Sequence, residues 1–543
     1  MPVIVELISV GEFRGWALND EDWSDIIMIE LRGQNGLLAK LQANQYRRDL
    51  ADQCIGNGCH SFRSTLNSDL LLMSGDGRQL FVRATTSRGV ELPVTYVHGG
   101  PAQGGYYMSN EPPSLGGLAV TADGSVNSPA IFGESFFLDA IGSSDGALMR
   151  PRAEVPSYAR CEGFLAIRMY VYGDMLWWRE EGGVTERSAA PYFDHLGPRT
   201  RALIADGRIK IVFDMSNEGP PARHYGDWVQ LLHDELTRQG ISPLSCVMIN
   251  QNRVYEFDYR LWGRENNVVE LMDVLNYDYY VARMARSLEA LPLEKALDIP
   301  KADSLWKVYT CLNFTPRPTR VSFVAWLVAS GLAAHGELSF AGMKNFKADG
   351  KDFTVASWFP ERDITITGMA QLRDMGPMTL DLERESGTYV PEFDLGPIDS
   401  YARTFLTVVT ESDFSPGDVR RVTEKVIKPL ALGHPVVVVG NPGSLQLLRD
   451  YGFQTFSPWI DETYDLIDDR RERMRRVQGE LRRLCSMSFD QLAGLRRSLE
   501  AVTDHNVRHA RRGLAQVFSA AVERDLITQL QALHTRTRSG SRA

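Results

Sequence analysis

Residues Thr410–Phe456 read TESDFSPGDVRRVTEKVIKPLALGHPVVVVGNPGSLQLLRDYGFQTF, and this stretch decides the fold class of the chain. An apolar strand ends at Glu411 in a polar loop, and Thr423 is placed to cap a helix. The strand PVVVVG follows, and a turn from Gly440 to Gly443 leads into another helix. Strands that alternate with helices predict a parallel sheet covered by helices on both faces.

The same stretch predicts an anion site at the strand ends. The N-terminus of a helix offers free N–H groups and the positive end of the helix dipole. Lys425, in the first turn after Thr423, adds a point charge suited to a phosphate. The glycine turn before Ser444 lets backbone approach a ligand closely at a second helix start. We therefore expect a diphosphate site here; a surface capping box with a solvated lysine is the alternative.

The pattern T-E-K, then P, then G-x-P-V-V-x-G resembles the donor-binding segment of the α-fucosyltransferase family and related bacterial glycosyltransferases. These are GT-B enzymes, with two Rossmann-like domains and the nucleotide-sugar in the C-terminal one. The resemblance implies that Glu424 holds ribose or sugar hydroxyls and that Lys425 contacts the diphosphate. The family usually has Tyr where this chain has Arg421, so GDP-fucose is not implied. The matching residues are Glu411, Thr423, Glu424, Lys425, Pro429, Gly433, Pro435 and Gly440, and we add Arg421, Asn441 and Gly443 to the donor-binding set.

Two further segments agree with that resemblance. CLNFTPRPTRVSFVAWL (311–327) begins the same domain, and in these families an Asn at the first strand end and an Arg entering the helix face the diphosphate. Asn313 and Arg320 match that pattern, with Arg317 as the alternative arginine. The segment YGFQTFSPWIDETYD (451–465) resembles the part that closes the donor domain in glycosyltransferases of bacterial surface-polysaccharide loci.

A catalytic base is expected in the acceptor half if the enzyme inverts the sugar configuration, because a carboxylate must take the proton of the acceptor hydroxyl. The candidate bases lie near the ends of predicted strands and are Asp214, Glu218, Glu256 and Asp258. For each of them the alternative is a solvated carboxylate or a helix cap. No Asp-x-Asp motif stands convincingly beside a strand, so we expect no metal. Cationic side chains, among them Arg320, Lys425 and Arg421, would then stabilise the leaving group.

The N-terminal residues 1–95 read as an all-β unit, because short β-branched runs alternate with turn formers. RGWAL (14–18) and NQYRRDLADQCIGNGCHSFRSTL (44–66) resemble a small β-module found fused to bacterial glycosyltransferases. This β-module has two possible roles: a purely structural role, and an accessory role in binding a glycan or a partner. Residues 96–155 are rich in Gly, Ser, Pro and Asn and read as a linker.

Composition and charge limit the remaining possibilities. The 543 residues carry a net charge of −10, which argues against a nucleic-acid-binding protein. No apolar run is long enough to cross a membrane, no signal peptide is evident and the six cysteines are scattered, so we expect a cytoplasmic protein with reduced thiols. The charge is uneven: residues 468–543 hold 16 Arg, no Lys and 9 acidic residues, a net +7, which leaves −17 for the rest.

That basic end has three interpretations. The first is a solvated helical face. The second is a surface for anionic lipid headgroups or an acidic partner at the inner membrane face. The third is a pairing surface for a homodimer, formed by the apolar positions of 507–533.

Together these observations predict an α/β chain with a GT-B-like pair of Rossmann-type domains. The expected parts are a β-sandwich module (1–95), a linker (96–155), an acceptor-side domain (156–302), a donor-binding domain (303–466) and Arg-rich helices (467–543). The expected activity is metal-independent transfer of a hexosyl or deoxyhexosyl group from a nucleotide-diphosphate sugar to a glycan or lipid-linked acceptor in bacterial surface-polysaccharide synthesis. The alternatives are a non-catalytic glycan-binding protein on a degenerate GT-B scaffold and a nucleotide-sugar epimerase.

Overall fold

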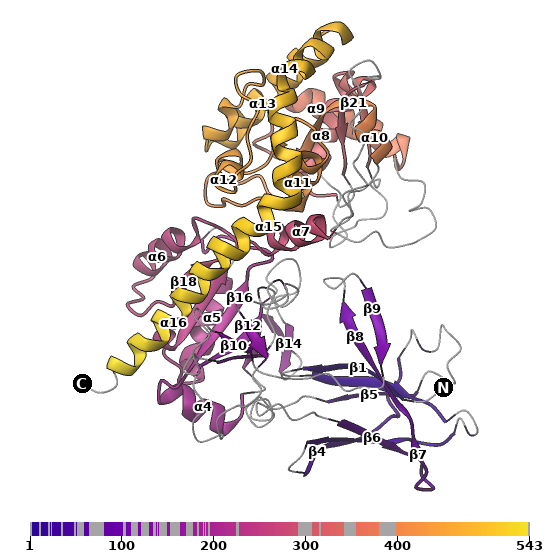
Figure 1. Cartoon of the computed structure of the whole chain (residues 1–543), viewed down its shortest axis with the longest axis vertical. Coiled ribbons are helices and arrows are strands. Elements are labelled where there is room, and N and C mark those ends of the chain that lie inside the picture. Colours follow the sequence, from indigo (N-terminus) through magenta and orange to yellow (C-terminus); the bar gives the residue numbers. More distant parts are fainter. Residues whose placement is uncertain are drawn as a thin grey trace. The chain divides into compact units, whose positions relative to one another are not determined.

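A computed structural model of the whole chain gives the fold (Figure 1). It describes residues 3–9, 12–19, 22, 24–33, 36–47, 50, 59–64, 81–100, 105–109, 118–120, 130–133, 137, 140, 149–151, 163–169, 178–181, 184–187, 189, 192–193, 196–223, 227–290, 307–313, 316–340, 355–378 and 398–540. The chain forms two compact units. Unit 1 comprises Met1–Asn250, Tyr259–Tyr277 and Glu523–Ala543, and unit 2 comprises Gln251–Asp258 and Asp278–Val522.

Unit 2 contains a four-stranded parallel sheet in the order β20-β19-β21-β22. Every residue of β21 and β22 is buried, as expected for parallel strands with both faces covered. The strands are β19 (Lys307–Cys311), β20 (Gly336–Leu338), β21 (Thr404–Thr410) and β22 (Val436–Val439).

Helices cover this sheet. α11 packs on β21 and β22, and α13 packs on β22. α8 and α9 lie against each other closely enough that a Cβ on Gly368 would lie 1.9 Å from the Ala325 carbonyl oxygen, so only glycine fits there. The helical segments of unit 2 are α7 (Tyr279–Glu289), α8 (Pro318–Ala329), η7 (Leu332–His335), α9 (Arg362–Met375), α10 (Ile398–Ala402), α11 (Glu424–Ala431), α12 (Ser444–Asp450), η9 (Thr463–Leu466), α13 (Arg470–Cys485), α14 (Phe489–Arg508), η10 (His509–Gly513), α15 (Leu514–Val517) and η11 (Phe518–Val522).

Unit 1 contains a seven-stranded sheet in the order β12-β10-β11-β13-β16-β17-β18. The run from β11 to β18 is parallel, and β10 and β12 add antiparallel pairs at one edge. The strands are β10 (Leu118–Val120), β11 (Ala130–Gly133), β12 (Met149–Pro151), β13 (Gly163–Arg168), β16 (Ile209–Met215), β17 (Cys246–Asn250) and β18 (Asp273–Asn276); β14 (Trp178–Glu181) pairs separately with β15 (Val184–Arg187).

Four helical segments connect or cover the strands of this sheet: α4 (Pro198–Ala205), α5 (Trp228–Arg238), η5 (Pro243–Ser245) and α16 (Glu523–Gly540). α16 comes from the far end of the chain and packs on this unit. The Tyr277 hydroxyl bonds Glu523 Oε1 at 2.8 Å, and the His534 ring lies 5.9 Å from the Phe164 ring. The residues of α6 (Tyr255–Glu265) are divided between the two units.

The N-terminal part of unit 1 consists of two further sheets that share one hydrophobic core. That core draws on both sheets, with Val3 and Phe13 from one and Ile29 and Val82 from the other, all buried. The Val82 amide also donates to the Tyr96 hydroxyl oxygen at 2.8 Å. The sheet orders are β5-β2-β1-β8-β9 and β4-β3-β6-β7. Their strands are β1 (Val3–Ser9), β2 (Glu12–Ala17), β3 (Met28–Gly33), β4 (Gly36–Gln42), β5 (Ser61–Ser64), β6 (Phe81–Thr85), β7 (Glu91–Leu92), β8 (Val94–Gly100) and β9 (Gly105–Ser109).

The expected α/β class with N-terminal β-structure is confirmed, and the linker prediction needs correction. The range 96–155 contains β9 of an N-terminal sheet and β10, β11 and β12 of the seven-stranded sheet. A Gly- and Ser-rich composition lowers the average strand propensity, yet short strands form where a neighbouring strand supplies hydrogen bonds.

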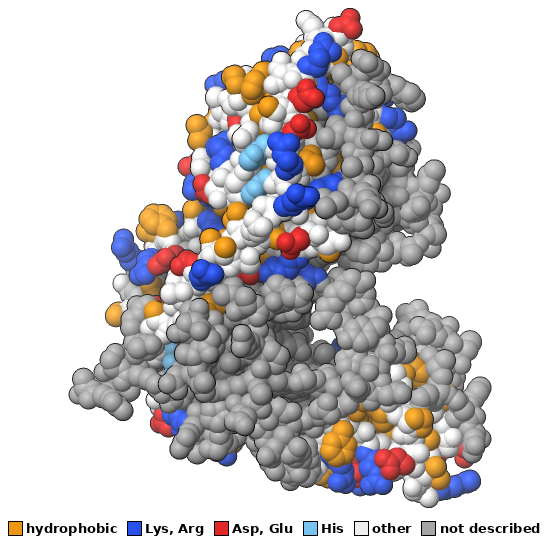
Figure 2. Space-filling model, in the orientation of Figure 1, with side chains coloured by type: hydrophobic (Ala, Val, Ile, Leu, Met, Phe, Trp, Pro, Cys, Tyr) orange, Lys and Arg blue, Asp and Glu red, His pale blue; other side chains and the backbone are white. Residues whose placement is uncertain are grey.

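The arginines of the C-terminal helices lie among acidic and neutral side chains. On the face drawn in Figure 2, blue side chains along these helices alternate with red ones and with pale-blue histidines. In α13, Arg475 and Arg476 both pair with Glu472, at 3.2 Å each. The proposed lipid-facing role of this segment stays a prediction.

Candidate functional site

The candidate site lies at the carboxyl edge of the parallel sheet in unit 2. Because β19, β21 and β22 run in one direction, the loops after them leave from the same edge. Residues 411–423 connect β21 to α11, and residues 440–443 connect β22 to α12 (Figure 1). Most of the predicted donor-binding residues fall in these loops or in the first turn of α11.

Thr423 begins α11, and Glu411 holds it in place. The Thr423 hydroxyl accepts a hydrogen bond from the Lys425 amide at 3.3 Å, the contact of a helix N-cap. Glu411 Oε1 accepts from the Thr423 amide at 3.1 Å, and Oε2 accepts from the Thr423 hydroxyl at 2.8 Å. Both oxygens of this buried carboxylate are occupied, so Glu411 fixes the start of the helix.

Glu424 and Lys425 form the first turn of α11. Lys425 Nζ donates to Glu424 Oε1 at 2.8 Å, and the Lys425 side chain is 36% exposed. Glu424 is 5% exposed, and within the described residues its Oε2 has no hydrogen-bond partner. Burial raises the pKa of Glu424, but the charges of Lys425 and Lys428 outweigh burial and leave the pKa below its ordinary value. An ionised, unsatisfied acceptor therefore lies beside an accessible ammonium group.

Two adjacent arginines in the loop 411–423 have different environments. Arg421 is 2% exposed and donates to Asp413 and, at 3.3 Å, to Gln251 Oε1, so the protein itself binds its guanidinium. Arg420 is exposed and crosses over Gly443, where an added Cβ would lie 2.6 Å from Arg420 Nε. We predicted Arg421 as a donor-binding residue and did not predict Arg420. The available signal was the Arg-Arg pair itself, since neighbouring residues of an extended loop point in opposite directions.

Asp465 occupies the N-terminus of α12, which we expected to be open to a phosphate. The Gly443 amide donates to the Asp465 carbonyl oxygen at 2.7 Å. The Asp465 carboxylate accepts from the amides of Leu445 and Gln446 at 3.0 and 3.2 Å. Since a protein carboxylate already uses these N–H groups, the expectation of a second free helix N-terminus is wrong.

Gly440 and Asn441 shape the turn after β22. A Cβ on Gly440 would lie 3.2 Å from Glu411 Cγ, so glycine allows the two loops to approach each other. Asn441 Oδ1 accepts from the Ser415 amide at 2.9 Å and ties the turn to the loop 411–423.

Asn313 and Arg320 both bind Thr410, the last residue of β21. Arg320 Nε and Nη2 donate to the Thr410 carbonyl oxygen at 3.1 and 2.9 Å, and the Thr410 hydroxyl donates to Asn313 Oδ1 at 2.7 Å. Asn313 is 1% exposed and Arg320 is 4% exposed. The side chains that we expected to face a diphosphate instead brace the strand end from which the loop 411–423 departs.

The segment after β17 adds a second support for that loop. Asn252 Nδ2 donates to the Asp418 carbonyl oxygen, and Asn252 Oδ1 accepts from the Arg420 amide, both at 2.8 Å. Gln251 Nε2 donates to the Val422 carbonyl oxygen at 2.8 Å. These bonds fix the backbone on both sides of Arg420 and so determine where its side chain begins.

Asp214 has the contacts of a structural carboxylate. It is fully buried at the end of β16, and its two oxygens accept from the amides of Phe137 and Ser216 at 3.0 and 2.9 Å. Both carboxylate oxygens are therefore engaged by backbone amides and not directed at a substrate. The structure thus favours Asp214 least among the predicted bases.

The other carboxylates differ in exposure. Glu218 is half-buried in the turn after β16 of unit 1. Glu256 is exposed and Asp258 is buried in the first turn of α6, both within unit 2. A role as base stays a prediction for Glu218 and Glu256.

Among the described residues, no group of three or more His, Cys, Asp or Glu side chains is arranged to hold a metal ion. Within the same part of the chain, no helix combines the length and apolar character needed to cross a membrane.

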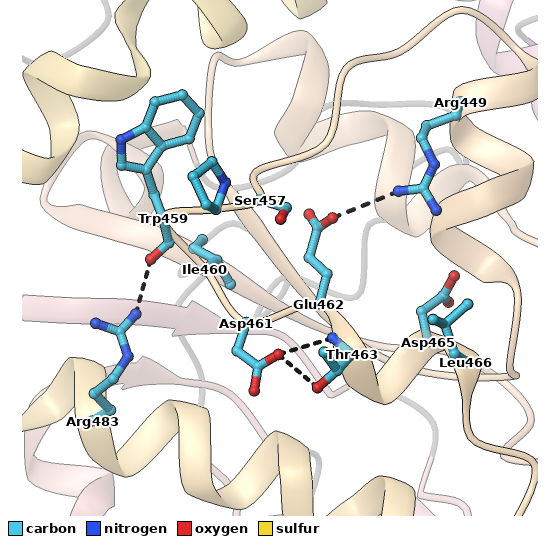
Figure 3. A pocket seen from close by; sticks show the side chains of 11 residues that line it. Arg449, Ser457, Trp459, Ile460, Asp461, Glu462, Thr463, Asp465, Leu466 and Arg483 are labelled. Carbon is cyan, nitrogen blue, oxygen red and sulfur yellow. Dashed lines mark hydrogen bonds and ion pairs between the residues drawn. The ribbon is translucent and has the colours of Figure 1, made fainter.

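A pocket of about 660 Å³ lies elsewhere in unit 2, beside α12 and α13 (Figure 3). Residues 457–466 form most of its wall, and Arg449 and Arg483 complete it. Figure 3 shows Arg449 directed at Glu462, 3.6 Å away, and Arg483 donating to the Trp459 carbonyl oxygen at 2.9 Å. Both guanidinium groups are engaged by the wall itself, and Asp465 is the residue that connects this wall to the turn after β22.

Comparisons with known proteins show a distant structural likeness. No protein-family model and no curated protein matches this sequence. An α,α-trehalose 6-phosphate synthase from Burkholderia multivorans has 14% identity over 70% of this chain and 73% of its own, with a TM-score of 0.33. A second structure, titled as trehalose-6-phosphate from E. coli bound with UDP-2-fluoro glucose, has 12% identity over 68% and 73%, with a TM-score of 0.32. At these TM-scores no residue role is transferred, and the fucosyltransferase resemblance stays a prediction.

Proposed function

We propose that the protein transfers a sugar from a nucleotide-diphosphate sugar to an acceptor hydroxyl, with the donor bound at the carboxyl edge of the sheet in unit 2. The observation that carries the proposal is the Glu424–Lys425 pair. Glu424 offers a buried oxygen without a hydrogen-bond partner in the described structure, and the Lys425 ammonium beside it is accessible. A nucleotide-sugar presents hydroxyls and a diphosphate at neighbouring positions, which matches this pair.

Each part of the donor has a partner in the site. Lys425 and the first N–H groups of α11 bind the diphosphate, and exposed Arg420 adds a second positive charge. Glu424 Oε2 accepts a hydrogen bond from a ribose or sugar hydroxyl, which satisfies a carboxylate oxygen that is otherwise buried without a partner. Glu411, Asn313 and Arg320 keep the loop and the helix start in position.

The same groups support the chemistry. The bond between the anomeric carbon and the diphosphate oxygen breaks as the acceptor oxygen bonds to that carbon, so negative charge grows on the leaving diphosphate. Fixed positive charges at Lys425 and Arg420 stabilise it without a metal. The acceptor proton passes to a carboxylate, and of the predicted bases Glu256 belongs to the same unit as the donor site. The proposal includes a GT-B arrangement of donor and acceptor domains. It also includes a glycan or a lipid-linked molecule as the acceptor.

A thermal-shift screen with UDP, GDP, CDP and their sugars tests donor binding, because a ligand that binds the folded state raises the melting temperature. We expect one nucleotide and its sugars to raise the melting temperature of the wild type. The same ligands should not raise the melting temperature of Lys425→Ala. Lys428→Ala, one turn further along α11, is the matched control and should keep the increase. If no nucleotide stabilises the wild type, or if the two variants respond alike, the assignment of this site fails.

Product analysis separates transfer from the alternatives. With the donor that the screen identifies, a transferase releases nucleoside diphosphate faster when an acceptor is added. Turnover to an isomeric nucleotide-sugar without any acceptor would indicate an epimerase, and binding without either reaction would indicate a glycan-assembly protein.

A further inference from the structure

One side chain, that of Asn252, binds the backbone on both sides of the peptide that leads into Arg420. Asn252 is fully buried and belongs to unit 2. Its Nδ2 donates to the Asp418 carbonyl oxygen and its Oδ1 accepts from the Arg420 amide, both at 2.8 Å. The Arg253 amide donates to the Arg420 carbonyl oxygen at 2.9 Å. Two consecutive residues, distant in sequence from the loop 411–423, therefore bind both backbone polar groups of Arg420.

The turn before Arg420 is held from another direction by Ser415. The Ser415 hydroxyl accepts from the Val419 amide at 3.2 Å and from the Gly417 amide at 3.4 Å. Asn441 Oδ1 in turn accepts from the Ser415 amide at 2.9 Å. Gly417 has a φ of 103°, a conformation that favours glycine. These bonds fix the course of the backbone up to Arg420.

The side chain of Arg420 is accessible although its backbone is held. It is exposed, and within the described part of the chain its guanidinium takes part in no hydrogen bond or ion pair. It passes over Gly443, where an added Cβ would lie 2.6 Å from Nε. The Gly443 amide donates to the Asp465 carbonyl oxygen at 2.7 Å, so this turn is held as well. The donors of a cation on a fixed backbone thus remain available to a ligand.

The neighbouring residue Gln251 connects the same segment to Lys425 of the proposed donor site. Gln251 is fully buried, and its Nε2 donates to the Val422 carbonyl oxygen at 2.8 Å. Val422 directly precedes Thr423, the N-cap of α11. The Thr423 hydroxyl accepts from the Lys425 amide at 3.3 Å and from Lys425 Nζ at 3.5 Å. Two consecutive buried amide side chains therefore hold the main chain at residues 420 and 422, just before the helix start that carries this lysine.

We propose that Asn252 is a positioning residue for binding of the donor diphosphate and that it acts through Arg420. This inference rests on the proposed function and deepens it. A guanidinium presents parallel N–H donors that match two phosphate oxygens. Binding an anion orders both the side chain and the loop that carries it, and each ordering step weakens affinity. Because Asn252 orders the loop before the ligand arrives, only the side chain of Arg420 is left to immobilise.

A double-mutant cycle, measured by calorimetric titration with inorganic pyrophosphate, tests this role. Arg420→Ala should weaken pyrophosphate binding about 10-fold, the loss expected for a charge-assisted hydrogen bond. Asn252→Ala should weaken it about 3- to 10-fold, because the loop must then be ordered on binding. In the Arg420→Ala background, Asn252→Ala should cause no further loss, since the residue through which it acts is already absent.

Asn506→Ala is the matched control. Asn506 is 1% exposed, lies in unit 2 and binds the backbone of a single residue, Gln454, in the same two-way manner. Its Oδ1 accepts from the Gln454 amide at 2.9 Å, and its Nδ2 donates to the Gln454 carbonyl oxygen at 2.8 Å. We expect Asn506→Ala and Asn252→Ala to lower the melting temperature by similar amounts. Only Asn252→Ala should weaken pyrophosphate binding, which a purely structural role would not explain.

Ser415→Ala gives a second, milder variant in case Asn252→Ala does not fold. It removes one hydroxyl and leaves the contacts of Asn252 in place, while the Val419 amide beside Arg420 loses its acceptor. Ser415→Ala should weaken pyrophosphate binding about 2- to 5-fold in the wild-type background. In the Arg420→Ala background it should again have no effect.

The outcomes distinguish this inference from the function on which it rests. Losses that add in the double variants, equal pyrophosphate affinities of Asn252→Ala and Asn506→Ala, or wild-type affinity in Arg420→Ala overturn the positioning role while the donor site stands. Pyrophosphate affinity that is unchanged in Lys425→Ala, or absent from the wild type, overturns the donor site itself.

Discussion

Glu361 and Arg482 bind each other through two hydrogen bonds, from Nη1 to Oε1 at 2.7 Å and from Nη2 to Oε2 at 2.5 Å. The same guanidinium lies 5.1 Å from the ring centroid of Trp326, whose Nε1 donates to Glu361 Oε2 at 3.0 Å. A bidentate pair that also stacks on an aromatic ring is stronger than an ordinary surface ion pair. It holds α13 against α8 and the start of α9.

Arg482→Ala should therefore lower the free energy of unfolding by about 1–2 kcal/mol. Arg476→Ala, whose exposed pair with Glu472 has no aromatic neighbour, should lower it by less than about 0.5 kcal/mol. Urea denaturation followed by tryptophan fluorescence measures both variants. Equal losses in the two would show that the contact with Trp326 adds nothing.

Asp465→Asn should destabilise the start of α12, because the amide group replaces one of two acceptors with a donor that faces a backbone N–H. We expect a loss of about 1–2 kcal/mol and faster hydrogen exchange at Leu445 and Gln446. Asp461→Asn, on an exposed carboxylate bonded to Thr463, is the control. Unchanged exchange at the two amides would show that the carboxylate does not hold this helix end.

Gly443→Ala should reduce both stability and donor binding. Gly443 has a φ of 74°, and its added Cβ would meet Arg420 Nε at 2.6 Å, so the substitution strains the turn and displaces the cation. Gly479→Ala is the control, since no atom lies within 4 Å of its added Cβ and it is inside α13. This second variant should gain about 0.5–1 kcal/mol of stability and keep donor binding. Calorimetry and urea denaturation of both variants give the comparison.

Stability should fall as the pH drops below about 6.5, because two buried histidines are neutral in the folded protein. Burial, joined at His434 by the charge of Arg496, lowers the pKa of His434 to about 3, and burial lowers that of His233 to about 4. In the unfolded chain these histidines bind protons near pH 6.5, whereas in the folded protein they stay neutral. Between pH 7 and pH 5, each histidine therefore lowers the free energy of unfolding by about 2 kcal/mol. His434→Gln and His233→Gln should flatten this dependence, and His335→Gln, at an exposed position, should preserve it. Urea midpoints at pH 5, 6 and 7 provide the measurement.

The fold of 404–450 followed from local sequence signals. Buried β-branched runs formed β21 and β22, and Thr423 capped α11 as expected, because strand patterning and capping act over a few residues. The hydrogen-bond partners of individual side chains could not be predicted from these local signals. The contacts of Arg320 with Thr410, of Asp465 with α12 and of Asn252 with residues 418–420 join segments far apart in sequence. A single sequence contains no signal for such pairings.

Charge composition was a poor guide to the C-terminal helices for a related reason. A count of arginines does not say which of them face inward. Arg473 is almost fully buried and binds three carbonyl oxygens, and Arg482 is paired with Glu361. The stems of such side chains pack while their charged ends find acceptors, so a basic helix can belong to a protein core.

The division of the chain has a consequence for its synthesis. The polypeptide passes between the two units four times, at 250/251, 258/259, 277/278 and 522/523. Because α16 packs on unit 1 through Glu523 and His534, that unit lacks part of its structure until the residues from 523 onward have left the ribosome. We expect a nascent chain stopped before residue 523 to expose the apolar surface of unit 1 that α16 covers, and to bind chaperones until α16 has been synthesised.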